Sequence, residues 1–101
     1  MPEMYVRVRW PDGEVQRCYS PSTVVEEYFT PGVAYTVPDF VERSRTALGI
    51  ASERVRERYG FACTGAAEEL ARIEGVAATF RREPPAMVTV EALLNADGSE
   101  R

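Results

Sequence analysis

The alternation of apolar and polar residues near the N-terminus constrains the fold of this chain most. From Met4 to Trp10, every second residue is apolar, and the residues between them are tyrosine or arginine. This is the pattern of a strand with one buried face. The segment Pro11 to Gly13 supplies proline and glycine for a tight turn, and Glu14 to Tyr19 has the composition of a return strand. We therefore predict a β-hairpin.

A long helix is predicted from Asp39 to Tyr59. Asp39 and Glu42 have the spacing of a capping box, and Gly60 stands where a left-handed residue would end the helix. Gly49, in the middle, indicates either a close helix contact or a bend. The residues expected to face inward are Phe40, Ser44, Ala47, Leu48, Ala51, Val55 and Tyr59.

A second helix is expected to follow, capped by Thr64 and ended by Pro84 and Pro85. Glu68 and Glu69 are interpreted as acids of its first turn, where they interact well with the helix dipole. Its apolar stripe comprises Ala66, Ala67, Leu70, Ile73, Val76, Ala77 and Phe80.

Shorter elements complete the predicted fold. We expect a short helix over Pro21 to Phe29 capped by Ser20, an extended segment over Val33 to Val37, and a last strand over Met87 to Leu94. The fold class is then α+β: a small, mostly antiparallel sheet, made of the hairpin and the late strand, packed against two long helices. We expect one domain over residues 1–94 and a flexible polar tail over residues 95–101.

Composition excludes several functions. The chain has no histidine, and its twelve basic residues are all arginine. Without histidine, the usual general base and the commonest metal ligand are missing, so we expect no catalytic residues, metal or cofactor. The net charge of −4 disfavours nucleic-acid binding. No apolar run is long enough for a membrane span and no signal peptide is recognised, so the expected location is the cytoplasm.

The predicted hairpin contains the candidate binding residues. Arg7 and Arg9 are two positions apart on one strand and therefore face the same way, whereas the direction of Arg17 depends on the register. Guanidinium groups suit carboxylates and other anions. Surplus aromatic rings favour an interface. The expected interaction surface consists of Arg7, Arg9, Trp10, Arg17 and Tyr19. The alternative is an ordinary solvated sheet face with surface ion pairs.

The two cysteines, Cys18 and Cys63, are the only thiols. A cytoplasmic location keeps such thiols reduced, and free cysteines are usually buried and unreactive. A redox pair is the alternative, and thiol titration separates the two interpretations.

Five strings of residues, taken in order, are similar to one family. They are Arg9–Gly13, Cys18–Ser22, Asp39–Val41, Ile50–Arg56 and Tyr59–Cys63. The chain resembles, from Met1 to Phe80, the small bacterial nitrogen-starvation-response proteins, a family named after a mycobacterial member. The resemblance implies a gene cluster with a nitrilase and a radical SAM protein that serves nitrile or cyanide nitrogen assimilation. It implies no assigned reaction.

These observations lead to a non-catalytic accessory domain as the expected function. Its partner would be a protein of the same pathway, either the nitrilase or the radical SAM protein, or a second copy in a homodimer. The alternative is a protein that binds a small anionic molecule, or a minor enzyme, with its site around Cys18 and Cys63.

Overall fold

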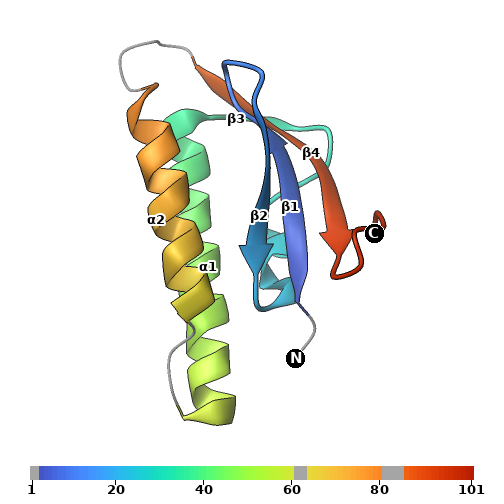
Figure 1. Ribbon diagram of the computed structural model, residues 1–101, viewed down its shortest axis with the longest axis vertical. Helices are drawn as coiled ribbons and strands as arrows, with labels where there is room; N and C mark the ends of the chain where they lie inside the picture. Colours follow the sequence, from blue (N-terminus) through green and yellow to red (C-terminus); the bar gives the residue numbers. More distant parts are fainter. Residues whose placement is uncertain (1–2, 61–63, 81–85) are drawn as a thin grey trace.

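The computed structural model describes residues 3–60, 64–80 and 86–101. Two helices lie together on one side of a twisted sheet, as Figure 1 shows. The α+β class predicted from the sequence is therefore confirmed. The elements are β1 (Met4–Arg9), β2 (Val15–Ser20), a 3₁₀ helix (Thr23–Glu27), β3 (Ala34–Thr36), α1 (Val37–Tyr59), α2 (Thr64–Ala78) and β4 (Met87–Asn95).

The sheet has four antiparallel strands in the order β2-β1-β4-β3. The predicted hairpin is β1 and β2, in which Arg7 lies opposite Arg17 and Tyr5 lies opposite Tyr19. The predicted late strand, β4, lies in the interior of the sheet between β1 and β3. The sheet therefore ends in β2 on one side and β3 on the other.

A β-bulge in β4 changes which side chains share a face. Val8 is paired with Val90, but Arg7 is paired with Ala92, so Glu91 is the extra residue. Bulged residues bend a strand and redirect a side chain. Here Glu91 bonds both Arg7 and Arg9, and therefore lies on their face of the sheet.

The start of α1 differs from the predicted capping box. Thr36 is the N-cap, and its hydroxyl accepts a hydrogen bond from the Asp39 N–H at 3.2 Å. Asp39 is instead in the first turn, where its carboxylate pairs with Arg43. The predicted end is correct: Gly60 has a φ of 79° and its N–H donates to the Arg56 carbonyl. Only a residue tolerant of positive φ suits that position.

Most of the predicted inward residues of α1 are buried, but one of them is not. The side chain of Tyr59 is half exposed. Among the described residues, no atom outside the helix lies within 4 Å of where a Cβ on Gly49 would stand, so the interpretation of Gly49 as a close helix contact was wrong. The alternative of a bend stays a prediction. The predicted short helix exists as the 3₁₀ turn, and its cap is Ser22 rather than Ser20.

The core lies between the sheet and the helices. Trp10 packs edge-on against Phe40 with ring centroids 5.4 Å apart, and Phe29 packs against Phe40 at 5.3 Å. On β1, the buried side chains are those of Met4, Val6 and Val8. One continuous cluster therefore fills the space between the layers.

The C-terminal residues have defined contacts. The Asn95 N–H donates to the Ser99 carbonyl, and the Arg101 N–H donates to the Leu93 carbonyl. The Arg101 guanidinium also pairs with Glu26 of the 3₁₀ helix. The mobility expected for residues 95–101 stays a prediction, and these contacts favour an ordered end instead.

Candidate functional site

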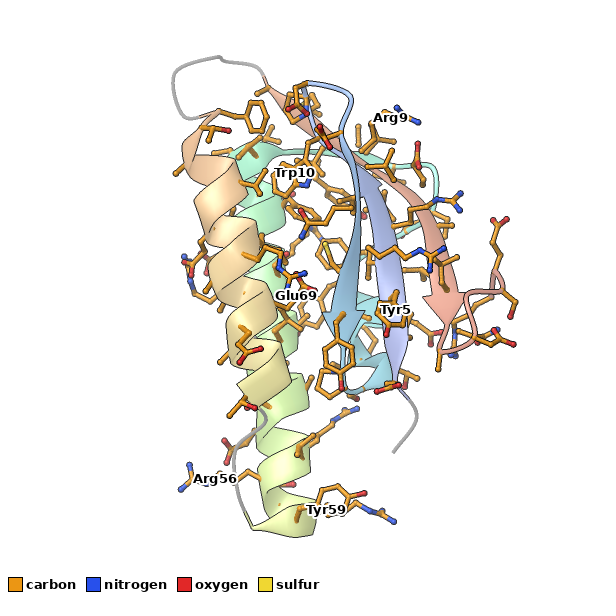
Figure 2. The ribbon with its side chains drawn as sticks, in the orientation of Figure 1. Tyr5, Arg9, Trp10, Arg56, Tyr59 and Glu69 are labelled. Atoms are coloured by element: carbon orange, nitrogen blue, oxygen red, sulfur yellow. The ribbon has the colours of Figure 1, made fainter. Side chains whose placement is uncertain are left out.

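The face of the sheet turned away from the helices presents three arginines. In Figure 1 both helices lie on the other side of the strands. Arg7 and Arg17 are direct cross-strand neighbours, and Arg9 is two residues from Arg7 on β1. We call Arg7, Arg9, Arg17 and Tyr19, together with Tyr5 and Glu91, the arginine face. Figure 2 shows Arg9 and Tyr5 on the strands of this face.

Glu91 holds two of these arginines in place. Its Oε1 accepts from Arg7 Nε at 3.2 Å, and its Oε2 accepts from Arg9 Nε at 2.8 Å. Arg9 also donates from Nη1 to the Gly13 carbonyl of the hairpin turn at 3.1 Å. The side chain of Glu91 is 22% exposed, whereas that of Arg9 is 52% exposed. One carboxylate therefore orients two guanidinium groups whose outer nitrogens still reach solvent.

Because of Arg17, this face has an excess of positive charge. Among the described residues, it has no ion-pair partner. One of its terminal nitrogens, Nη1, lies 3.9 Å from where a Cβ on Gly98 would stand, so the side chain reaches toward the C-terminal turn. Like charges directly opposite on paired strands are destabilising. The stability of the fold therefore does not explain why Arg7 and Arg17 lie opposite each other.

Two tyrosines give this face its aromatic part. The rings of Tyr5 and Tyr19 meet edge-on with centroids 5.9 Å apart. Both side chains are partly buried. Aromatic rings and arginines are the residues enriched in protein interfaces.

Trp10 does not belong to the arginine face. It is 2% exposed and lies on the helix side of the sheet, where its ring is nearly parallel to that of Phe80 at 6.0 Å. Its position follows from the alternation of β1, which directs Trp10 and Arg9 to opposite faces. Of the five residues predicted for the surface, the structure therefore brings together Arg7, Arg9, Arg17 and Tyr19.

Cys18 is buried in the core. It lines a small cavity with Ser20 and Ser44, and burial raises the pKa of its thiol well above the ordinary value, with a further contribution from the charge of Glu69. A protonated, buried thiol is a poor nucleophile. This matches the interpretation of an unreactive thiol at this position. Cys63 lies outside the described residues.

Glu69 has a role that the sequence analysis missed. It is the sixth residue of α2, and the described first turn of α2 contains no acid, so the capping interpretation was wrong. Its side chain is 4% exposed and lies between α2 and β2 (Figure 2). The signal was available: Glu69 lies on the helical stripe of Ala66 and Ile73.

A line of hydrogen bonds joins Glu69 to the hairpin. Trp10 Nε1 donates to Gln16 Oε1 at 2.9 Å, and Gln16 Nε2 donates to Glu69 Oε2 at 3.3 Å. The other carboxylate oxygen, Oε1, accepts from the Tyr19 N–H at 2.8 Å. Arg72 Nη1 lies 3.7 Å from that same oxygen. Because burial of a carboxylate requires such partners, this network fixes α2 against the edge of the sheet.

A groove opens beside this network, between the hairpin and the second half of α2. It encloses about 550 Å³. Its lining comprises Trp10, Asp12, Glu14, Val15, Gln16, Arg72, Gly75, Val76, Thr79 and Phe80.

Among the described residues, no three cysteine, aspartate or glutamate side chains gather as a metal ion would need. No helix within the described ranges has both the length and the apolar composition to cross a membrane.

Comparisons with known proteins identify the family. Neither a search of curated proteins nor a search of solved structures found a match. The family model described as "Nitrogen starvation-induced protein NitG" matches residues 5–93, which covers every strand and helix except the ends of β1 and β4. The chain therefore belongs to the NitG family of nitrogen starvation-induced proteins.

Proposed function

We propose that this protein is a non-catalytic accessory domain that binds a larger protein of a nitrogen-assimilation pathway through its arginine face. The observation that supports the proposal is the grouping of Arg7, Arg9 and Arg17 on the sheet face turned away from both helices (Figure 1). Among the described residues, Glu91 pairs with Arg7 and Arg9, and Arg17 has no ion-pair partner. The family description supports a role under nitrogen starvation.

The chemistry of this face favours an acidic partner surface. A guanidinium group offers a planar set of donors that matches a carboxylate, and it is weakly hydrated, so it suits interfaces. Two copies of this protein placed face to face would bring like charges together, which disfavours a homodimer through this surface. We therefore propose the nitrilase of the implied gene cluster as the first partner to test and the radical SAM protein as the second.

Absolute mass from light scattering, after mixing with each candidate partner, tests the proposal. We expect a complex with one of them that weakens as salt is added, because exposed charges are screened. If the protein stays a lone monomer or dimer with both candidates, the accessory role is contradicted.

A pair of double variants tests the surface. Arg9→Ala with Arg17→Ala keeps the Arg7 and Glu91 pair and removes two exposed charges. The matched control, Arg56→Ala with Arg58→Ala, removes the same charge from the last turn of α1. We expect the first to weaken the complex by about tenfold or more, as loss of interface arginines commonly does. Equal effects of the two variants would contradict the proposed surface.

The alternative of a thiol-based site has less support. Cys18 is buried with a raised pKa, and the arginine face lies on the opposite side of the sheet from it. A small anion that bound Arg9 and Arg17 would still be consistent with the charge of this face. Displacement of the protein partner by such an anion would distinguish competition for one surface from an independent binding site.

A further inference from the structure

The free edge of β2 is the feature that leads beyond the arginine face. β2 is the last strand on its side of the sheet. The backbone N–H of Trp10 donates to the Glu14 carbonyl at 2.8 Å, so Trp10 and Glu14 form a hydrogen-bonded pair of the hairpin. Since bonded and non-bonded pairs alternate in an antiparallel pair, the backbone groups of Val15, Arg17 and Tyr19 point away from β1. These three residues therefore present the donors and acceptors of an edge strand.

The backbone N–H of one of these three residues already has an acceptor. The Tyr19 N–H donates to Glu69 of α2 at 2.8 Å, so the carboxylate stands where a carbonyl of a further strand would be. Within the described part of the chain, the N–H groups of Val15 and Arg17 have no such acceptor. The edge is therefore closed by α2 at one end and open beside the hairpin turn. Open edges pair readily with another extended chain.

The groove continues the line of the open edge. Val15 and Gln16 form one wall. The facing wall is a stripe at helical spacing, formed by Arg72, Gly75 and Val76 of α2 and by Thr79 directly after it. Within the described ranges, no atom outside α2 lies within 4 Å of where a Cβ on Gly75 would stand, so the middle of this wall is open.

We propose that this groove binds an extended segment of a partner protein, which adds to β2 as an antiparallel strand. The backbone of the segment would bond to Val15 and Arg17, as in β-strand addition. A segment antiparallel to β2 has its C-terminal end beside the start of β2, where Asp12 and Glu14 line the groove. Arg72 lies toward the N-terminal end of the segment, because it approaches the Glu69 oxygen that accepts from the Tyr19 N–H. The segment thus has a basic residue at its C-terminal end, an acidic residue at its N-terminal end and apolar side chains between them. This site uses the backbone of Arg17 and not its side chain, so it does not depend on the proposed function of the arginine face.

The test is a titration of the full ¹⁵N-labelled chain with a designed peptide, followed by NMR. The probe is acetyl-Glu-Val-Thr-Val-Lys-amide, and the control is the same peptide with proline at its third position, which removes an N–H and disfavours ladder pairing. We expect the probe alone to shift the amide signals of Val15, Arg17 and Val76 with a dissociation constant of about 1 mM, as a short peptide allows. Shifts elsewhere, equal shifts with both peptides, or no shifts up to about 5 mM would overturn the proposal.

A matched pair of variants tests the position of the segment. Gly75→Phe fills the groove, and Gly49→Phe makes the same change at a second helical glycine that also faces open space, on α1. We expect Gly75→Phe to weaken probe binding at least about tenfold and Gly49→Phe to leave it unchanged, since only the first obstructs the groove. Equal binding by both variants would contradict the proposal. Shifts at Val15 and Arg17 that appear when the protein concentration alone is raised would show that a second copy of this protein binds the edge. That result would overturn the proposal of a segment from another protein.

Discussion

The buried carboxylate of Glu69 should not tolerate replacement by its own amide. An indole N–H can only donate, so Trp10 fixes the Gln16 amide with Oε1 toward the indole and Nε2 toward Glu69. The other oxygen of Glu69 accepts from the Tyr19 N–H. Both oxygens of residue 69 must therefore accept. Glu69→Gln would turn an NH₂ group toward one of these two donors.

The expected cost follows from that mismatch. One hydrogen bond is lost and a buried donor is left without an acceptor, which costs about 1–3 kcal/mol in the free energy of unfolding. Urea unfolding measures this cost through the fluorescence of Trp10, the one tryptophan of the chain. The control is Glu68→Gln, because Glu68 is exposed. There we expect a change within about 0.5 kcal/mol.

The swapped double variant tests the direction of the bonds. With Gln16→Glu and Glu69→Gln together, residue 16 accepts from both the indole and the new amide, and residue 69 still accepts from Tyr19. We expect this double variant to recover about 1 kcal/mol or more relative to the sum of the single losses, because the two residues are in direct contact. Losses that add within about 0.5 kcal/mol would refute the reasoning.

Three further predictions concern other parts of the molecule. Gly49→Ala should raise the free energy of unfolding by about 0.5–1 kcal/mol, since a Cβ there meets open space; a loss in urea unfolding would contradict this. Glu91→Ala should lower the free energy of unfolding by about 1 kcal/mol, because the guanidinium groups of Arg7 and Arg9 lose their partner, and this loss should be smaller at high salt. Burial raises the pKa of the Cys18 thiol in the folded protein, so the unfolded chain loses this proton first as the pH rises. The contribution of Cys18 to the free energy of unfolding is therefore complete below the ordinary thiol pKa of 9.0 and is lost as the pH rises above that value. Cys18→Ala should flatten that loss, and the native thiol should react with Ellman's reagent only on unfolding.

Local patterns were sufficient to predict the elements. The alternation from Met4 to Trp10 predicts β1 and its buried face, and Gly60 predicts the end of α1. Both depend on neighbours in sequence, whose geometry is fixed by strand and helix periodicity. The caps were less accessible, because Thr36 and Asp39 are both good capping residues close together.

Long-range pairing accounts for what the sequence did not predict. The place of β4 between β1 and β3 depends on which strands meet in space. The bulge at Glu91, which sets this carboxylate between Arg7 and Arg9, depends on the register of that pairing. Glu69 follows the same rule: its partners on β2 lie 50 or more residues away along the chain. The arginines of the arginine face were therefore predictable, but the place of Glu91 among them was not.

The most direct test of the proposed accessory role is the mass of the mixture of this protein with the nitrilase or the radical SAM protein, measured by light scattering at low and at high salt. We expect a complex at low salt that Arg9→Ala with Arg17→Ala abolishes or strongly weakens, while Arg56→Ala with Arg58→Ala leaves it intact. A mixture that shows only the separate masses of both proteins would contradict the proposed accessory role. So would a complex that persists unchanged without Arg9 and Arg17.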